Sequence, residues 1–167
     1  ALSRIKQRSD KLLSFVGQYS SLTHLPNIKP TYFEFESLIN ECATMLPNTD
    51  VEINIKGNQQ CYGDPEQLAQ VFINLLKNAV EADQQEKCNI TITLVVQQNN
   101  QVIEVIDNGP GFANLNNVLT PFYTTKSDGS GIGLTLCAEI IHNHGGQFSV
   151  SNTADGHGKI HMSLPIG

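Results

Sequence analysis

Residues 65 to 83 carry two stripes of opposite chemistry at helical spacing, and this pattern limits the folds open to the chain. An asparagine side chain competes for backbone hydrogen bonds, so two asparagines one turn apart are unusual inside a helix. The pattern predicts a helix whose apolar face lies in a core and whose polar face lies in solvent or along a ligand groove. The apolar stripe is Leu68, Phe72, Leu75, Ala79 and Ala82, and the polar stripe is Gln70, Asn74, Asn78 and Glu81.

The other elements follow from helix caps and alternating apolar residues. Asp64 and Pro65 start the helix at 65–83, because the carboxylate caps free amides and proline suits the first helical position. Helices and strands alternate without a βαβ rhythm, so we expect an α+β fold with a mixed sheet covered on one face by helices. The Asn-Asn pair in QQNNQ suits a tight hairpin turn, and Gly145 and Gly146 cap the last helix. Further helices are expected at 36–46 and 130–144, and strands at 31–35, 51–57, 60–63, 89–96, 101–107, 146–152 and 159–166.

Residues 1–23 form an amphipathic segment with heptad spacing. The seam covers too few heptads to separate a coiled coil from an ordinary helix packed on its own domain, so both interpretations stay open. The prolines of HLPNIKP indicate a linker. Because the chain begins inside this helix, we expect it to be part of a longer protein. The seam residues are Leu2, Ile5, Ser9, Leu12, Val16 and Tyr19.

Charge and cysteine content narrow the function classes. The 167-residue chain has a net charge of −6 and a pI near 5.2, which disfavours a nucleic-acid partner. Its four cysteines form no CxxC pair, so neither a zinc site nor a disulfide framework is indicated, and a reducing compartment is expected. No apolar run is long enough to cross a bilayer and no secretory signal opens the chain, so we expect no membrane contact by these residues.

The sequence DNGPGF, residues 107–112, admits two interpretations. Asp, Asn, Gly and Pro are all common in ordinary turns. Alternatively, the Asp107 carboxylate accepts a hydrogen bond from an exocyclic amine such as that of adenine, while Gly109 and Gly111 let the backbone approach a ring. A carboxylate used in this way favours adenine over guanine, which presents a carbonyl at that position.

The glycines of GSGIGL, residues 129–134, precede the last predicted helix. Backbone amides and the positive end of the helix dipole suit such a position to phosphate. The Walker pattern is excluded because no Gly-Lys-Ser/Thr ends the motif, and the dinucleotide pattern lacks its third glycine, since Leu136 stands there. Amide and carboxylate oxygens on the polar face of helix 65–83 suit magnesium, which completes its shell with water and phosphate oxygens.

In this order and at these separations, the motifs resemble the ATP-binding domain of histidine protein kinases, within the superfamily that includes gyrase, the Hsp90 chaperones and MutL. NLLKNAVEA (74–82) resembles the N box, DNGPGF the G1 box, PFYTTK (121–126) the F box and GSGIGL the G2 box. The resemblance covers about residues 31–165. It implies a Bergerat-type fold, a two-layer α/β sandwich that binds ATP and Mg²⁺.

The resemblance also implies roles for single residues. Asn78 would be the magnesium ligand, Asp107 the acceptor for the adenine amine, and Phe122 the anchor of a lid over residues 109–129. Asn74 and Asn78 would be the catalytic residues. The implied ATP-binding set is Asn74, Asn78, Glu81, Ala82, Asp107, Gly109, Gly111, Phe112, Phe122, Thr124, Thr125, Lys126, Gly129, Ser130, Gly131, Ile132, Gly133 and Leu134.

Two positions bear on the type of enzyme. Many histidine kinases have a lysine where this chain has Glu81, a difference that resembles the nitrogen-regulation type and leaves a contact between Glu81 and phosphate open. In the ATPase relatives, the position of Asn74 carries a glutamate that acts as general base, which an amide cannot do at neutral pH. Slow hydrolysis is therefore expected, unless Glu81 reaches a water.

The alternatives are a self-contained ATPase of the gyrase or MutL type and a scaffold without nucleotide binding, and the intact motifs disfavour the scaffold.

The domain plan and the partners are likewise implied by the resemblance. Residues 1–25 would be the second helix of a dimerisation and phosphoacceptor hairpin, 26–30 a linker and 31–167 the catalytic domain. The implied partners are the phosphoacceptor histidine helix, a response-regulator receiver domain and a second copy of the intact kinase in a homodimer. A cytoplasmic location is implied, with anchoring of the intact protein in the inner membrane left open. The five histidines, all expected at the surface, are His24, His142, His144, His157 and His161.

Overall fold

The structure is a computed structural model that describes residues 24–46, 51–82, 88–125 and 129–166, together with positions 5–6, 9–10, 12–13, 16–17 and 20. Each described position before residue 24 is helical and exposed, including Ile5, Leu12 and Val16 of the predicted seam, whereas Leu2 and Tyr19 lie outside the described residues. The elements are β1 (Thr31–Glu34), α2 (Phe35–Thr44), β2 (Val51–Gly57), β3 (Gln60–Gly63), α3 (Pro65–Ala82), β4 (Cys88–Gln97), β5 (Asn100–Asp107), α4 (Gly133–Asn143), β6 (Gln147–Asn152) and β7 (Gly158–Pro165).

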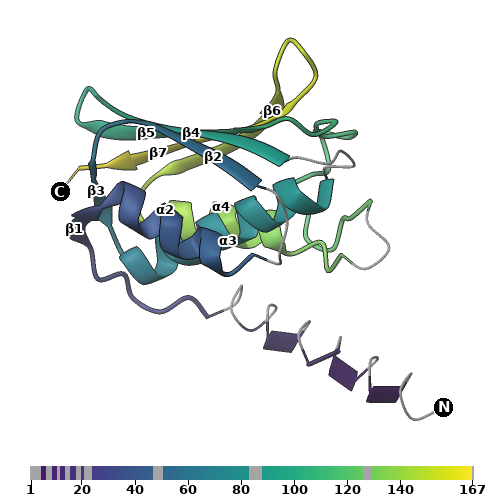
Figure 1. Ribbon diagram of the computed structural model, residues 1–167. Coiled ribbons are helices and arrows are strands. Elements are labelled where there is room, and N and C mark those ends of the chain that lie inside the picture. Colours follow the sequence, from purple (N-terminus) through teal and green to yellow (C-terminus); the bar gives the residue numbers. More distant parts are fainter. Residues whose placement is uncertain are drawn as a thin grey trace.

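Five strands form one mixed sheet in the order β2-β4-β5-β7-β6. Strand β2 runs parallel to β4, and the other neighbours are antiparallel. Helices α2, α3 and α4 cover one face of this sheet (Figure 1). The predicted α+β architecture is therefore confirmed. A second, small sheet was not predicted: β1 and β3 pair antiparallel, from Thr31–Gly63 to Glu34–Gln60.

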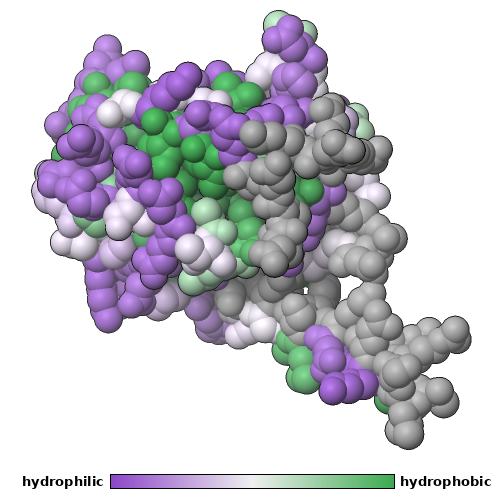
Figure 2. All heavy atoms as spheres, in the orientation of Figure 1, coloured by the Kyte–Doolittle hydropathy of each residue, from purple (hydrophilic) through white to green (hydrophobic). Residues whose placement is uncertain are grey.

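The core lies between the sheet and its helices. From Cys88 to Leu94, every second residue of β4 is buried, as expected for a strand with one face in the core. The predicted apolar stripe of α3 is buried except for the half-buried Ala82. Phe72 meets Phe35 of α2 edge-on, with ring centroids 5.5 Å apart. Figure 2 shows apolar surface between β2 and α2. Leu38 of α2 and Ile53 of β2 are partly buried and pack on the core.

Most predicted boundaries differ from the observed ones by one or two residues, and two of the differences have a clear cause in the backbone. The hairpin turn falls at Gln98–Asn99, because these residues adopt positive φ angles of 48° and 65°, and Asn100 already belongs to β5. Helix α4 begins at Gly133 rather than at residue 130, since Gly131 has a left-handed φ of 67°. At the other end, Gly145 has a φ of 74° and its N–H donates to the His142 carbonyl, which confirms the predicted cap.

Asp64 joins three segments at the start of α3. Its Oδ1 accepts from the backbone N–H groups of Glu66 and Gln67 at 3.1 and 3.2 Å, which confirms the predicted cap. Its Oδ2 accepts from the backbone N–H of Lys29 in the linker at 2.7 Å. Its own N–H donates to Nε2 of His144 at 3.0 Å. The linker, the start of α3 and the end of α4 therefore meet at one residue.

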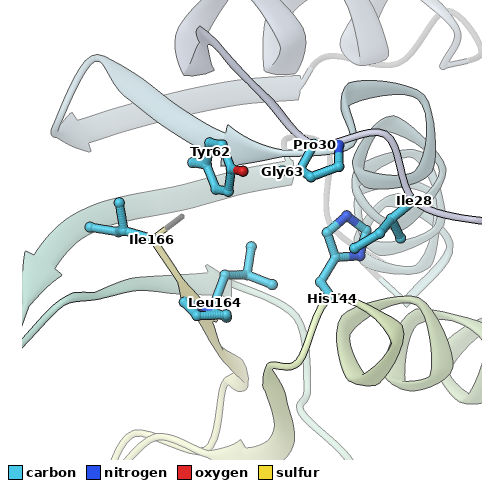
Figure 3. A pocket seen from close by; sticks show the side chains of 8 residues that line it. Ile28, Pro30, Tyr62, Gly63, His144, Leu164 and Ile166 are labelled. Carbon is cyan, nitrogen blue, oxygen red and sulfur yellow. The ribbon is translucent and has the colours of Figure 1, made fainter.

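His144 is buried, and the expectation that it lies at the surface was wrong. Its Nδ1 lies 2.8 Å from the Ile140 carbonyl oxygen, which can only accept, so Nδ1 carries the proton and Nε2 is left to accept from Asp64. Figure 3 shows the ring beside Ile28, at a small cavity that Leu164 also lines. His24 and His142 are exposed, whereas His157 and His161 are half-buried.

The four cysteines are buried and form no disulfide. Burial raises the pKa of Cys42 to about 11 and the pKa values of Cys61 and Cys137 to about 12. Within the described residues, no cluster of three or more His, Cys, Asp or Glu side chains could hold a metal ion. No helix in that part of the chain has the length and apolar character that crossing a membrane requires.

We expect Asp64→Ala to lower the free energy of unfolding by about 2–4 kcal/mol, because it removes a helix cap and leaves the Lys29 N–H without its acceptor. Asp64→Asn keeps an oxygen at the cap and should cost less. Urea denaturation measures both, with Glu66→Ala, a change at an exposed residue of the same turn, as the control. Equal effects of Asp64→Ala and Glu66→Ala would contradict the joining role of Asp64.

Candidate functional site

A cavity opens where α3, β5, β7 and the start of α4 meet. It brings together residues of three motifs that lie far apart in the sequence. Its walls are mostly apolar, with the polar side chains of Asn78 and Asp107 among them. The lining residues are Leu75, Asn78, Ala79, Ala82, Val105, Asp107, Gly111, Phe112, Leu134, Gly158 and Ile160.

Asp107 ends β5, and the loop after it begins with side-chain hydrogen bonds. The residue is half-buried rather than fully buried, and its Oδ1 accepts from the Gly109 N–H at 2.9 Å. Asn108 exchanges two hydrogen bonds with Asn89 at the start of β4: its N–H donates to the Asn89 carbonyl at 3.1 Å, and its Oδ1 accepts from the Asn89 N–H at 2.8 Å. The carboxylate therefore lies at the end of the β4–β5 pairing, which one backbone bond and one side-chain bond of Asn108 extend by a residue.

The rest of the loop is held by the hairpin between β6 and β7. Asn152 accepts from the Phe112 N–H at 2.8 Å, and its Nδ2 donates to the Phe112 carbonyl at 3.0 Å. Nδ1 of His157 lies 2.9 Å from the Gly109 carbonyl oxygen. Sequence reasoning missed Asn152 and expected His157 only as a surface residue. No local signal marks either one, because their partners lie 40 and 48 residues away.

Glycine at position 158 keeps the cavity open beside the carboxylate. A Cβ atom there would lie 2.7 Å from Asp107 Oδ2 and 3.2 Å from the Phe112 ring. Gly111 has a φ of 71°, and a Cβ on it would lie 2.8 Å from the Asn152 side-chain oxygen. The loop and the hairpin therefore approach each other too closely for side chains at these two positions.

The residues of the polar stripe of α3 do not all line the cavity. Asn78 is among the described residues that line it, as is Ala82 of the apolar stripe, but Asn74 and Glu81 are not. Glu81 is exposed, with its carboxylate 3.8 Å from the Lys77 ammonium. The Nδ2 atom of Asn74 is buried and makes no hydrogen bond within the described part of the chain. Burial raises the pKa of Cys137 on α4, and interaction with Asn74 opposes part of that rise.

The predicted F box and G2 box lie against each other. The Phe122 N–H donates to the Gly131 carbonyl at 2.9 Å, and a Cβ on Gly131 would lie 2.7 Å from the Tyr123 carbonyl oxygen. Phe122 has a φ of 68° and is 50% exposed. A Cβ on Gly133 would lie 3.9 Å from Asn78 Nδ2, so the start of α4 adjoins the polar face of α3.

The remaining predicted residues lie around this junction. Ile132 is buried, Ser130 is half-buried and Leu134 lines the cavity. Thr124, Thr125 and Gly129 are exposed, whereas Lys126 lies outside the described residues. The described residues between 109 and 129 form no helix or strand, and the ordering of a lid over a ligand stays a prediction.

The sequence of this chain is similar to a known protein family and to several curated proteins. Residues 63–167 match the family described as "Histidine kinase-, DNA gyrase B-, and HSP90-like ATPase". Sporulation kinase C of Bacillus subtilis is 35% identical over 126 residues, which are 73% of this chain and 29% of that kinase. The chain spans less than two fifths of the length of the curated sporulation and sensor kinases that it matches here.

Solved structures share the fold. The nucleotide-free catalytic domain of histidine kinase ThkA aligns with a TM-score of 0.69 and 28% identity, over 82% of this chain and 95% of that one. Histidine kinase ThkA in complex with response regulator protein TrrA aligns with a TM-score of 0.76 and 22% identity, over 96% of this chain and 49% of that one.

Two glycines with similar backbones offer a matched test of the loop packing. Gly111 and Gly156 have φ angles of 71° and 87°, but a Cβ would meet other atoms only at Gly111. We expect Gly156→Ala to cost about 1–2 kcal/mol from the left-handed backbone alone. Gly111→Ala should cost about 1–3 kcal/mol more because of the added collision. Urea denaturation measures the difference, and equal costs would show that the loop and the hairpin are not closely packed.

Proposed function

We propose that the chain, which belongs to the histidine kinase-, DNA gyrase B- and HSP90-like ATPase family, is the ATP-binding catalytic part of a sensor histidine kinase. Its curated relatives include sporulation kinases and sensor histidine kinases. Because the chain covers only part of those proteins, the activity of the whole kinase is included in the proposal.

The observation that carries the proposal is the chemistry of the cavity. Apolar side chains, including Leu75, Phe112 and Ile160, form walls suited to the faces of a planar base. Asp107 supplies a carboxylate that can accept from the exocyclic amine of adenine. The space beside that carboxylate depends on Gly158, where a Cβ would contact both Asp107 and Phe112. The residues present therefore fit an adenine base.

The phosphates of ATP would lie where α3 adjoins the start of α4. Backbone amides of Gly131 and Gly133 at the start of α4 would bind them, and Ile132 at the cap supplies no side-chain hydrogen bond to these amides. Asn78 would be the magnesium ligand, since magnesium takes one or two protein oxygens and completes its shell with water and phosphate. The ion would neutralise charge on the phosphates. Phe122 would anchor a lid at its contact with Gly131.

The proposed reaction transfers a phosphoryl group to histidine. A neutral imidazole nitrogen of the phosphoacceptor attacks the γ-phosphorus, the bond to the bridging oxygen breaks, and ADP leaves. Two histidines of this chain are engaged elsewhere: His144 with Asp64 and His157 with Gly109. The acceptor would lie on a helix of the intact kinase, with residues 1–25 as the second helix of that hairpin and 26–30 as the linker to the catalytic domain. A response-regulator receiver domain would take the phosphoryl group next, and the intact kinase would be a homodimer.

The alternative is a self-contained ATPase, and two observations weigh against it. Asn74 is an amide where the ATPase relatives carry the glutamate base, and a placed base contributes about 10²–10⁴-fold to such a step. Glu81 is exposed beside Lys77 and is not among the described residues that line the cavity. The residues at positions 74 and 81 therefore favour transfer of the γ-phosphate to an acceptor over hydrolysis of ATP.

We expect the chain to bind Mg-ATP and Mg-ADP, with Asp107 selecting adenine. Asp107→Asn should weaken binding by roughly 1.5–3 kcal/mol, or about 10- to 150-fold, because it removes a charged acceptor. Calorimetric titration measures both affinities. Asp155→Asn, the same change at an exposed residue of the β6–β7 hairpin, is the control. Absence of heat with millimolar Mg-ATP, or equal binding by the Asp107 variant, would show that the cavity is not an adenine site.

We also expect the chain to phosphorylate a supplied phosphoacceptor-helix protein from γ-labelled ATP without labelling itself. Hydrolysis in the absence of that acceptor should be slow, because position 74 carries the amide of Asn74 and not a carboxylate that could act as a general base. Phosphate release on the order of one per minute or faster, abolished by Glu81→Gln, would instead support the ATPase alternative. Lys77→Gln tests whether a change beside Glu81 has the same effect without removing its carboxylate.

A further inference from the structure

We propose that Asn152 and His157 are positioning residues that hold the 109–112 loop in the conformation needed to bind a nucleotide base. The inference rests on the proposed function, and it adds two residues that belong to none of the four sequence motifs. Both lie outside the cavity lining, so they would act through the loop rather than by touching the base.

Asn152 binds the loop as a strand partner would. Its side-chain oxygen accepts from the Phe112 N–H at 2.8 Å, and its Nδ2 donates to the Phe112 carbonyl at 3.0 Å. One amide thus satisfies both polar groups of the residue whose ring lines the cavity. Asn152 is exposed, so these bonds are not a by-product of core packing. Aspartate could supply only the acceptor, which makes the amide specific.

His157 holds the other end of the same loop. Its Nδ1 lies 2.9 Å from the Gly109 carbonyl oxygen and therefore carries the proton. The ring is presented by a closed turn, in which the His157 N–H donates to Thr153 Oγ1 at 3.0 Å and the Thr153 N–H donates to the His157 carbonyl at 2.8 Å. The next residue is Gly158, which lies against the Asp107 carboxylate.

The two contacts fix the separation between the carboxylate and the ring. In the described part of the chain, side chains bond the backbone between 109 and 112: Asp107 at the Gly109 N–H, His157 at the Gly109 carbonyl and Asn152 at Phe112. Asp107 and Phe112 are the two ends of this span, and both line the cavity. Release of the span would let the ring move relative to the carboxylate, so base binding would weaken while phosphate binding near α4 would not.

The test separates base binding from phosphate binding. Calorimetry of the full chain would compare Mg-ATP with magnesium tripolyphosphate, which lacks the base, for wild type, Asn152→Ala and His157→Phe. We expect each variant to bind Mg-ATP about 5- to 10-fold more weakly, as expected for lost hydrogen bonds, and to bind tripolyphosphate within about twofold of wild type. Asp155→Asn, an exposed change in the same hairpin, should alter neither affinity.

A conservative replacement adds a second criterion. In His157→Asn, the side-chain amide can place a donor near the position of Nδ1, so Mg-ATP affinity should recover relative to His157→Phe. This pair carries the test if Asn152→Ala does not fold, which urea denaturation reports.

Three results would overturn the inference. If wild type binds Mg-ATP and both variants bind it equally well, the loop does not need Asn152 and His157 to hold its conformation, although the proposed function stands. If the variants lose tripolyphosphate affinity to the same degree as Mg-ATP affinity, the two residues serve the fold as a whole. If wild type does not bind Mg-ATP, the proposed function fails and this inference fails with it.

Discussion

The packing of one stripe of α3 against the sheet is the constraint on which the site depends. Leu68 and Phe72 are fully buried, and burial of such a side chain is worth about 1.5–3 kcal/mol, so rotation of α3 about its axis would be costly. Helix geometry then orients the polar stripe as well, because the two stripes are fixed relative to each other. Asn78 reaches the cavity and Glu81 faces solvent as a consequence. Packing of the apolar side chains, rather than polar contacts, thus fixes the direction in which the polar side chains of residues 74–82 point.

Asp64 extends this constraint to the segment that precedes β1. Its carboxylate caps α3 and also accepts from the Lys29 N–H, while its own N–H reaches His144 at the end of α4. The segment around Lys29 is therefore tied to the first turn of α3, the helix that carries Asn78 further along. In the proposed kinase, the segment before the linker belongs to the phosphoacceptor hairpin, so Asp64 stands at the connection between acceptor and ATP site.

Asn74 places a buried amide nitrogen near the Cys137 thiol of α4. Its Nδ2 is buried and meets the geometric criteria for a hydrogen bond with no acceptor in the described part of the chain. Glutamate at this position would supply the base of an ATPase, whereas the amide supplies none. The Cys137 thiol beside it is a weak acceptor at most.

The sequence alone determined the parts of this protein that depend on local chemistry. Two helical stripes, the Asp64–Pro65 start and the Gly145 cap specify α3 and the end of α4, and alternating residues specify the strands within a few positions. The motif order was enough to identify the family, because each motif is a short contiguous stretch. Tertiary structure alone decided the burial of His144, the separate sheet of β1 and β3, and the hold of Asn152 and His157 on the 109–112 loop. These features join residues far apart in the chain, and such pairings carry no local periodicity or spacing, since only the completed sheet brings their partners within hydrogen-bonding distance.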